Sequence, residues 1–294
     1  GARNSIRWRE VMRFLNIAVC GGDESAARLC ALLCGDGHRV RAYALDGAAL
    51  PEGVMRVGCM EGCLDGAEAV ILPAPAALPG GLLNAPLFRR EISAAELLDR
   101  IPEAAVICAG DAGTLPEGRY IEDYAGREEF AVGSAALTAE GALELAMAAG
   151  DSALWRGRAL VIGYGRLGVI LSQRLRGVGA KTTAAARRGG DTAMAEALGF
   201  DAVGIDKLDG RLGEFDYIFN TVSEPAIGVK RLAQIKAGAF MAELAPPPGG
   251  FDVKKAEELG IRAVDAPGLA GKYAPQALAE LTRDAVYAAL GEWL

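Results

Sequence analysis

Apolar residues in the first half of the chain alternate between short continuous runs and stretches with helical spacing. Residues 15–20 (LNIAVC) form an apolar run that Gly21 and Gly22 end, and residues 25–34 then carry apolar side chains at helical spacing. Further elements are predicted as strands at 39–44, 69–72 and 105–108, a helix at 93–100 capped by Ser93, and a proline-rich loop at 73–86. Strands separated by helices indicate a parallel sheet covered on both faces.

A second α/β series follows a helix predicted at 138–149, which we expect to begin at a Thr138 cap and to link two lobes. Its strands are predicted at 158–162, 181–186, 217–220, 239–244 and 261–264, and its helices at 167–178, 192–198, 253–259 and 275–294. A chain of 294 residues suits two domains.

The chain contains the glycine pattern GxGxxG, at Gly163, Gly165 and Gly168, in the setting that dinucleotide binding requires. The apolar run before it predicts a strand, and an uninterrupted helix is predicted after it. The glycines permit a tight turn, close approach of a pyrophosphate and close packing of helix on strand, while the helix N-terminus offers N–H groups to the phosphates. Cofactor-binding residues are therefore expected in the turn itself: Gly163, Tyr164, Gly165, Arg166, Leu167 and Gly168.

The end of the following strand favours NADP(H), with NAD(H) as the alternative. NAD-binding domains usually place an acid there, whereas this chain has Arg187 and Arg188 and no acid before Asp191. The planar guanidinium of Arg187 suits a 2′-phosphate, although both arginines can equally be solvated loop residues. Asn220, Thr221 and Val222 follow the next strand assigned in this lobe and are expected to line the cofactor cleft.

The fold class expected is therefore α/β, with two lobes that each hold a parallel sheet flanked by helices, the second being a Rossmann domain. We expect a flexible leader at 1–14 and an N-terminal α/β domain at 15–135 on the substrate side, joined by the C-terminal helix. The Rossmann domain is expected at 136–294.

Charge and composition argue against several classes of function. A net charge of −7 without a large basic cluster argues against nucleic-acid binding, and no apolar stretch reaches the ~20 residues of a membrane span, so we expect a cytoplasmic protein. The six cysteines fall in the first 110 residues and are interpreted as small core residues, with no metal expected. The single histidine, His38, precedes a strand and lies at the wrong end of it for a ligand cleft, which excludes a His/acid dyad.

Seven segments, in order along nearly the whole chain, resemble the A subunit family of dipicolinate synthase. They are GGDESAARL, LTAEGALELAM, VIGYGRLG, AKTTAAARR, FNTVSEPAIG, ELAPPPGGFD and DAPGLAGKYAP. The resemblance implies an NADP-linked oxidoreductase that acts with a flavoprotein B subunit. Together they would convert a dihydrodipicolinate-type precursor to dipicolinate in the mother-cell cytoplasm of a sporulating bacterium.

Three positions depart from the pattern expected of that family. Pro247 and Gln276 stand where lysines are expected, and Gly133-Ser134 stands where an Asn-Ala pair is expected. These positions touch the expected substrate cleft, so they bear on the substrate more than on the cofactor.

Oxidation of a dihydropyridine dicarboxylate requires a base and donors for two carboxylates. Glu140 and Asp23 are the candidate bases, and Lys272 is a candidate cation in the catalytic site. Ser134, Thr138, Gly249 and Gly250 are candidate substrate-binding residues. Each has an alternative structural role: Glu140 as an acid near a helix start, Asp23 as a helix cap, Lys272 as a surface residue.

Three functions remain open from the sequence. The first is the A subunit of dipicolinate synthase, the second is another NAD(P)-dependent two-domain dehydrogenase of a small acid, and the third is a non-catalytic nucleotide-binding subunit. A homo-oligomer is also left open.

Overall fold

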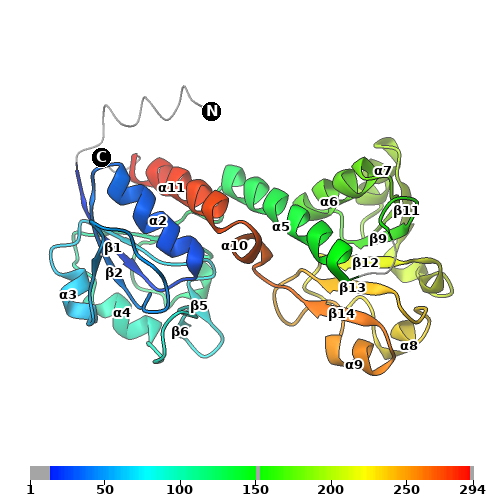
Figure 1. Ribbon diagram of the computed structural model, residues 1–294, viewed down its shortest axis with the longest axis horizontal. Coiled ribbons are helices and arrows are strands. Elements are labelled where there is room, and N and C mark those ends of the chain that lie inside the picture. The colour runs from blue at the N-terminus through cyan, green and yellow to red at the C-terminus, as the bar shows by residue number, and fades with distance from the viewer. Residues whose placement is uncertain (1–13, 150–152, 292–294) are drawn as a thin grey trace. The chain divides into compact units, whose positions relative to one another are not determined.

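The computed structural model describes residues 14–149 and 153–291, and Figure 1 shows the chain coloured by residue number. The chain divides into two compact units: unit 1 is Gly1–Gly133 with Ala274–Leu294, and unit 2 is Ser134–Tyr273. The division falls inside one helix, α5 (Glu128–Ala149), and again just before α11 (Pro275–Gly291). The leader expected at 1–14 lies, except for Phe14, outside the described residues.

Unit 1 is built on a six-stranded sheet in the order β3-β2-β1-β4-β7-β8. All neighbouring strands in it are parallel. Its strands are β1 (Asn16–Cys20), β2 (Arg39–Tyr43), β3 (Met55–Arg56), β4 (Ala69–Ile71), β7 (Val106–Ala109) and β8 (Glu122–Asp123). Apart from the small hairpin of β5 (Ala77–Leu78) and β6 (Leu82–Leu83), this is the doubly wound order, which reverses between β1 and β4.

Helices cover both faces of the unit 1 sheet. α2 (Glu24–Gly35) and α11 lie side by side on one face (Figure 1), where Leu33 and Leu290 share one apolar core. α3 (Met60–Leu64) and α4 (Ala94–Arg100) contribute Leu64 and Leu97 to the core on the other face. A short 3₁₀ helix, η1 (Ala112–Thr114), follows β7. The last described helix of the chain thus completes the core of the first unit.

His38 connects α11 to the sheet through a chain of hydrogen bonds. Its Nδ1 accepts from the backbone N–H of Leu15 at 3.2 Å, and its Nε2 lies 3.0 Å from the Tyr287 hydroxyl. That hydroxyl donates to Asp36 Oδ2 at 3.0 Å, so the imidazole is neutral and Nε2 carries its proton. Burial lowers the pKa of His38, against the opposing charge of Asp36. The histidine is a buried structural residue at the amino end of β2.

Unit 2 repeats the doubly wound order with the sheet β11-β10-β9-β12-β13-β14, in which all neighbouring strands are parallel. Its strands are β9 (Arg158–Ile162), β10 (Lys181–Ala186), β11 (Asp201–Gly204), β12 (Tyr217–Asn220), β13 (Phe240–Glu243) and β14 (Arg262–Asp265). The α/β fold class, with two parallel sheets flanked by helices, is confirmed. Both units, and not the second alone, have the Rossmann strand order.

Helices again cover both faces of the unit 2 sheet. α5 and α6 (Arg166–Gly177) bury Ala142 and Leu171 against β9 and β12. α8 (Val229–Leu232) and α9 (Val253–Glu258) cover the other face with Leu232 and Ala256. The remaining helices of the unit are α7 (Gly189–Ala197), α10 (Leu269–Tyr273), η2 (Ile205–Lys207) and η3 (Leu212–Glu214).

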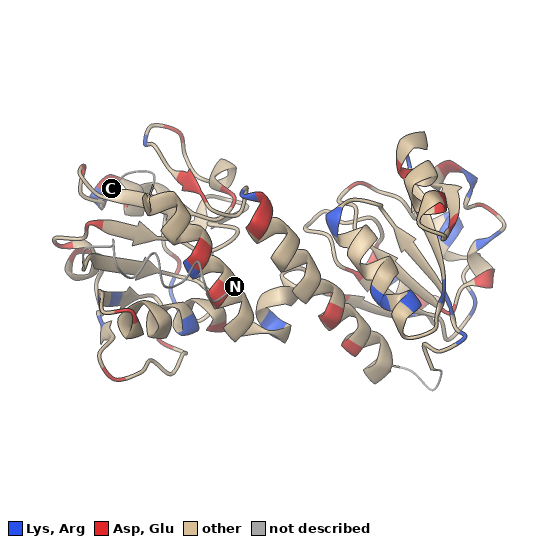
Figure 2. Ribbon diagram, turned by 90° about the horizontal axis from the view of Figure 1, so that it is seen from above, with Lys and Arg blue, Asp and Glu red and all other residues tan. Residues whose placement is uncertain are grey.

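Charged residues lie mostly on the helices and loops of both units, with acidic and basic ones interspersed (Figure 2). In the unit 2 sheet, Arg158 and Lys181 begin β9 and β10 at exposed positions, and the rest of both strands is buried. Glu243, at the end of β13, is the only buried Asp, Glu, Lys or Arg among residues 14–149 and 153–291. Buried charges are costly unless they are paired or hydrogen-bonded, so Glu243 requires a specific environment.

The predicted start of a helix at Thr138 is wrong. α5 begins at Glu128, and Thr138 lies inside it, with its hydroxyl donating to the Ser134 carbonyl oxygen at 2.9 Å. Gly133 and Ser134 weaken the helical signal, but Gly133 lies where α11 packs: a Cβ there would lie 2.7 Å from the Leu281 side chain. Within the described residues, α5 is also the one helix long and apolar enough, by length and composition, to cross a membrane. Its fully buried Ala142 is typical of a core helix.

Candidate functional site

The glycine turn between β9 and α6 lies at the carboxyl edge of the unit 2 sheet, where the strand order reverses. Gly163 has a φ of +98°, and a Cβ on it would overlap Thr221 and Val222. A Cβ on Gly168 would overlap the Gly163 carbonyl. Gly165 differs, because no described atom lies within 4 Å of a Cβ placed there. The three positions fit a dinucleotide: a tight turn, close helix packing and open space for the pyrophosphate.

The N-terminus of α6 is open to an anion, whereas the equivalent helix of unit 1 is not. Gly165 caps α6 and has no side chain that could occupy the position of an anion at the positive end of the helix dipole. In unit 1 the carboxylate of Asp23 caps α2, accepting from the Ser25 backbone N–H at 2.9 Å and from the Ser25 hydroxyl at 2.5 Å. A fixed carboxylate repels phosphate, so unit 2 holds the better anion site. Asp23, predicted as a candidate base, is engaged as a helix cap.

The side chains inside the turn differ in their access to a ligand. Tyr164 is 6% exposed, and its ring packs edge-on against Phe200 with centroids 6.5 Å apart. Its hydroxyl has no hydrogen-bond partner among the described residues, and burial raises the pKa of Tyr164. Arg166 is exposed and Leu167 is half-buried. Tyr164 therefore supports the turn from beneath and can offer a cofactor only its main chain.

Arg187 and Arg188 follow the end of β10 and are exposed, as a phosphate site requires, but each already has an acidic partner. Arg187 forms an ion pair with Glu224 from the loop after β12, and Arg188 Nε lies 2.9 Å from Asp191 Oδ2. Ion pairs between side chains this exposed contribute little, because water competes for both partners. Glu224 therefore holds Arg187 only weakly.

Thr221 and Val222 line the turn, and Asn220 lies below them. The Thr221 hydroxyl donates to the Ile162 carbonyl at 2.9 Å, which holds the ends of β9 and β12 together. Asn220 is fully buried, and its Nδ2 donates at 2.7 Å both to the Val222 carbonyl and to Glu243 Oε1. Of these three predicted cofactor-binding residues, Asn220 supports the turn from below, and Thr221 and Val222 lie at the surface of the turn.

Glu243 is a buried carboxylate that the sequence did not single out. It ends β13 directly opposite Asn220 in the register of the sheet and is 3% exposed. Oε1 accepts from the Ala245 backbone N–H at 3.0 Å as well as from Asn220, and Oε2 accepts from the Gly250 N–H at 2.8 Å. Burial raises the pKa of Glu243, and the hydrogen bonds from Asn220 and the amides oppose that rise. The sequence did contain a signal for this residue, because Glu243 is an acidic residue between apolar ones near the end of the strand predicted at 239–244.

A pocket of about 530 Å³ opens next to Glu243, between the N-terminus of α8 and the loop that leads to α9. Pro247, Gly249 and Gly250 line it. The amides of the two glycines were expected to bind substrate, but the structure engages both: Gly249 donates to the Pro246 carbonyl at 3.1 Å, and Gly250 donates to Glu243. The glycines shape this pocket wall without offering free amides.

The remaining predicted residues lie away from the turn. Glu140 Oε1 lies 2.9 Å from Arg174 in the last turn of α6, roughly 12 Å along that helix from the glycine turn. Ser134 and Thr138 lie inside α5, where their amides belong to the helix. Lys272 is exposed at the end of α10. The structure does not bring these four together with the turn.

The cysteines are free thiols and form no recognisable metal site. Over residues 14–149 and 153–291, no group of three or more His, Cys, Asp or Glu side chains is arranged to hold a metal. A hydrogen bond with Cys63 and burial raise the pKa of Cys20, and burial raises the pKa of Cys30 and of Cys108 to about 12 each. These buried thiols are held in the protonated form.

The fold and the glycine turn define a protein with a dehydrogenase-like Rossmann fold. Residues 16–115 match the family model described as the N-terminal domain of the dipicolinate synthase A subunit. The chain is 26% identical over 232 residues to the dipicolinate synthase A subunit of Bacillus subtilis strain 168, covering 76% of this chain and 78% of that protein. The resemblance stated from the sequence segments is confirmed: the chain is related to the A subunits of dipicolinate synthase, and its first domain belongs to their N-terminal domain family.

Solved structures show the same fold. The dipicolinate synthase A subunit from Bacillus halodurans matches with a TM-score of 0.80 at 23% identity, covering 93% of this chain and 97% of that one. Its counterpart from Bacillus subtilis matches with a TM-score of 0.78 at 24% identity, covering 96% and 97%. A transhydrogenase from Sinorhizobium meliloti matches at 0.66 and 17% identity, covering 94% of each chain.

Proposed function

We propose that this chain works as a dipicolinate synthase A subunit, which binds NADP(H) at the glycine turn and oxidises a dihydrodipicolinate-type dicarboxylate to dipicolinate. The observation that carries the proposal is the division of roles among the three glycines: Gly163 and Gly168 have no room for a side chain, and Gly165 faces open space. This is the arrangement that a dinucleotide requires. The relatedness to A subunits supports the choice of substrate.

The residues around the turn would hold the cofactor by main-chain amides and by charge. The amides at the start of α6 would receive the pyrophosphate, aided by the positive end of the helix dipole. Arg187, and beside it Arg188, would receive the 2′-phosphate, which favours NADP(H) over NAD(H). The bound nicotinamide would supply the hydride acceptor.

In the oxidation, the dihydropyridine ring loses a hydride to the nicotinamide and a proton to a base or to water, and the ring becomes aromatic. The protein's part is to orient the dicarboxylate and to receive that proton. Asp23 and Glu140 are each engaged, as a cap and as an ion-pair partner, and Lys272 lies at the surface of α10. We therefore propose neither Asp23 nor Glu140 as the base.

The chain would act with a flavoprotein B subunit in the mother-cell cytoplasm during sporulation, a role that its relatedness to an A subunit supports. The engagement of the candidate bases favours one alternative in particular, a nucleotide-binding subunit whose chemistry resides in the partner. In that case nucleotide binding would persist without hydride transfer by this chain.

The test is to incubate the purified chain, with and without the flavoprotein, with NADP⁺ and freshly prepared dihydrodipicolinate. Dipicolinate is followed by its ultraviolet absorbance, and NADPH by its own absorbance. We expect the two products to form in equal amounts. Dipicolinate formation that needs the flavoprotein and leaves NADP⁺ unreduced would favour the nucleotide-binding alternative. Absence of dipicolinate under every condition, despite nucleotide binding, would refute the assignment of substrate.

A further inference from the structure

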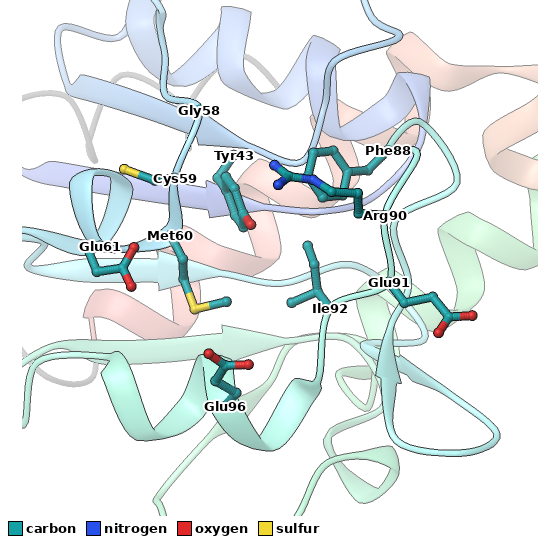
Figure 3. Close-up of a pocket in the computed structure, with 10 residues that line it drawn as sticks. All are labelled: Tyr43, Gly58, Cys59, Met60, Glu61, Phe88, Arg90, Glu91, Ile92 and Glu96. Atoms are coloured by element: carbon teal, nitrogen blue, oxygen red, sulfur yellow. The ribbon is translucent and has the colours of Figure 1, made fainter.

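Unit 1 contains a pocket of about 280 Å³ at the carboxyl end of β2, and Figure 3 shows the side chains that line it. Arg90 and the carboxylates of Glu61 and Glu96 line the same space. Because both signs of charge are present there, this pocket indicates no single class of ligand. The polar groups that do indicate one are buried in unit 2.

Two buried hydroxyl groups of unit 2 have no hydrogen-bond partner among residues 14–149 and 153–291. They belong to Tyr164, in the glycine turn, and to Thr182, in β10. Tyr164 is 6% exposed and Thr182 is 8% exposed, so neither hydroxyl is left to bulk water. An unpaired buried hydroxyl is costly, and such groups are normally satisfied by the protein or by an ordered water molecule.

Tyr164 and Thr182 belong to one layer, between the sheet and the helices α6 and α7. Thr182, Ala184 and Ala186 alternate along β10 and therefore point to the same face of the sheet. On that face Ala184 and Ala186 share an apolar cluster with Tyr164 and Phe200. The residues of this cluster that surround the two hydroxyls offer no polar side-chain atom to them, because they are alanines and a phenylalanine.

The Phe200 ring is the neighbour that the two residues have in common. It packs edge-on against the Tyr164 ring, with the ring centroids 6.5 Å apart. Asp201, the next residue along the chain, pairs with Thr183 in the parallel register of β11 and β10. The same register continued by one residue places Phe200 beside Thr182. The residues that carry the two unpaired hydroxyls therefore border the same ring.

Arg176 also lies at this ring but is engaged elsewhere. Its guanidinium lies 4.3 Å from the centroid of the Phe200 ring, and its Nη1 donates to the Leu198 carbonyl at 2.6 Å. Its Nη2 donates to the Gln173 side chain. Arg176 therefore satisfies neither hydroxyl, and its positive charge disfavours a cation in the space beside them.

We propose that one buried water molecule bridges the hydroxyls of Tyr164 and Thr182. Each hydroxyl can both donate and accept, so each can pair with water. The two hydroxyls are not hydrogen-bonded to each other, so a molecule between them is needed to satisfy both. The low exposure of both residues restricts that molecule to the size of water. The water would tie the second residue of the glycine turn to β10, the strand that leads to Arg187. The inference involves no bound nucleotide and does not rest on the proposed function.

A crystal structure of the full chain at high resolution tests the site directly. We expect an ordered water oxygen roughly 2.6–3.2 Å from both the Tyr164 and the Thr182 hydroxyl oxygens. A direct hydrogen bond between the two hydroxyls, a water that contacts only one of them, or the absence of any water there would overturn the proposal.

Two conservative substitutions test the bridge in solution. Tyr164→Phe and Thr182→Val each remove one hydroxyl with little change of shape. Each should lower the melting temperature of the full chain by about 2–4 °C, because the water loses a partner. The double variant should melt within about 1 °C of the less stable single variant, since both changes act on the same water. Tyr273→Phe removes a hydroxyl from an exposed tyrosine of unit 2 and, as the matched control, should shift the melting temperature by less than about 1 °C.

The melting temperatures can contradict the bridge in two ways. Single variants that melt at the wild-type temperature or above would show that the hydroxyls are simply unsatisfied, since the removal of an unpaired buried group relieves a cost. Losses that add in full in the double variant would show that the two hydroxyls have separate partners. All of these measurements are made without nucleotide, so their failure is distinguishable from a failure of the nucleotide site.

Discussion

Asn220 and Glu243 lie opposite each other at the ends of neighbouring strands, with Asn220 Nδ2 donating to Glu243 Oε1 at 2.7 Å. On one side, Asn220 also holds the carbonyl of Val222, a residue that lies against Gly163 of the turn. On the other side, Glu243 holds the amide of Gly250 in the pocket wall. This buried pair therefore links the glycine turn to the loop that lines the pocket beside Glu243.

Glu243→Gln should lower the free energy of unfolding of the chain by about 1–3 kcal/mol. The new amide group cannot accept at both positions where the carboxylate now accepts from Asn220, Ala245 and Gly250. Thermal unfolding measures the loss, and amide hydrogen exchange should locate it in residues 244–251. Glu257→Gln, at an exposed position of α9, is the matched control and should change stability by less than about 0.5 kcal/mol. A control as destabilised as the Glu243 variant would contradict this role.

The ion pair of Arg187 with Glu224 predicts two opposite effects on nucleotide selectivity. Arg187→Glu should weaken NADPH binding by about tenfold or more while changing NADH binding far less, because only NADPH carries the 2′-phosphate. Glu224→Gln should strengthen NADPH binding by about twofold to fivefold, because it frees Arg187 from a competing acid. Dissociation constants for both nucleotides measure these effects.

Lys181→Glu is the control for Arg187→Glu, since it makes the same change of charge at the opposite end of β10. It should leave the preference for NADPH over NADH unchanged. Equal losses of NADPH and NADH binding in Arg187→Glu would show that Arg187 does not recognise the 2′-phosphate.

Stability should fall as the pH falls below the ordinary pKa of histidine, 6.5, because burial lowers the pKa of His38 in the folded chain. Between the ordinary and the lowered pKa, the unfolded chain binds a proton that the folded chain does not, so acid favours unfolding. The stabilising contribution of neutral His38 is complete above pH 6.5 and is lost as the pH falls from 6.5 through the lowered pKa. The charges that face His38 and its partner Tyr287 are Asp36 and Arg283.

Melting temperatures between about pH 8 and pH 5 test the role of His38. The wild type should lose stability more steeply than His38→Gln between pH 6.5 and the lowered pKa. Arg39→Gln, an exposed neighbour, should follow the wild-type curve. Parallel curves for the wild type and His38→Gln would show that this histidine does not couple pH to folding.

The sequence predicted most accurately those elements that are continuous apolar runs with clear ends. β9, β10 and β12 have the predicted limits, because a glycine, an arginine or an asparagine follows or ends each apolar run. The two-residue strands β3 and β8 were missed, since they are too short to show any periodicity. β11 (DAVG) was missed for a similar reason, and α5 was predicted too short because Gly133 and Ser134 interrupt its pattern.

The site was predictable where it is local in sequence and was missed where it depends on sheet order. The glycine turn carries its whole signal in one segment, so its residues could be named in advance. Glu243 and Asn220 are 23 residues apart and meet only because β12 and β13 are neighbours.

The central claim is that the open space at Gly165 receives a pyrophosphate. Calorimetric titration with NADPH of the wild type, Gly165→Ala and Gly177→Ala tests it most directly, because a Cβ meets no described atom at either position. Both variants should fold with a nearly unchanged melting temperature. We expect micromolar binding of NADPH to the wild type and to Gly177→Ala, with a loss of about tenfold or more in Gly165→Ala, since its new methyl group enters the space of the phosphates. Unchanged affinity in Gly165→Ala, or no nucleotide binding by the wild type at millimolar concentration, would contradict it.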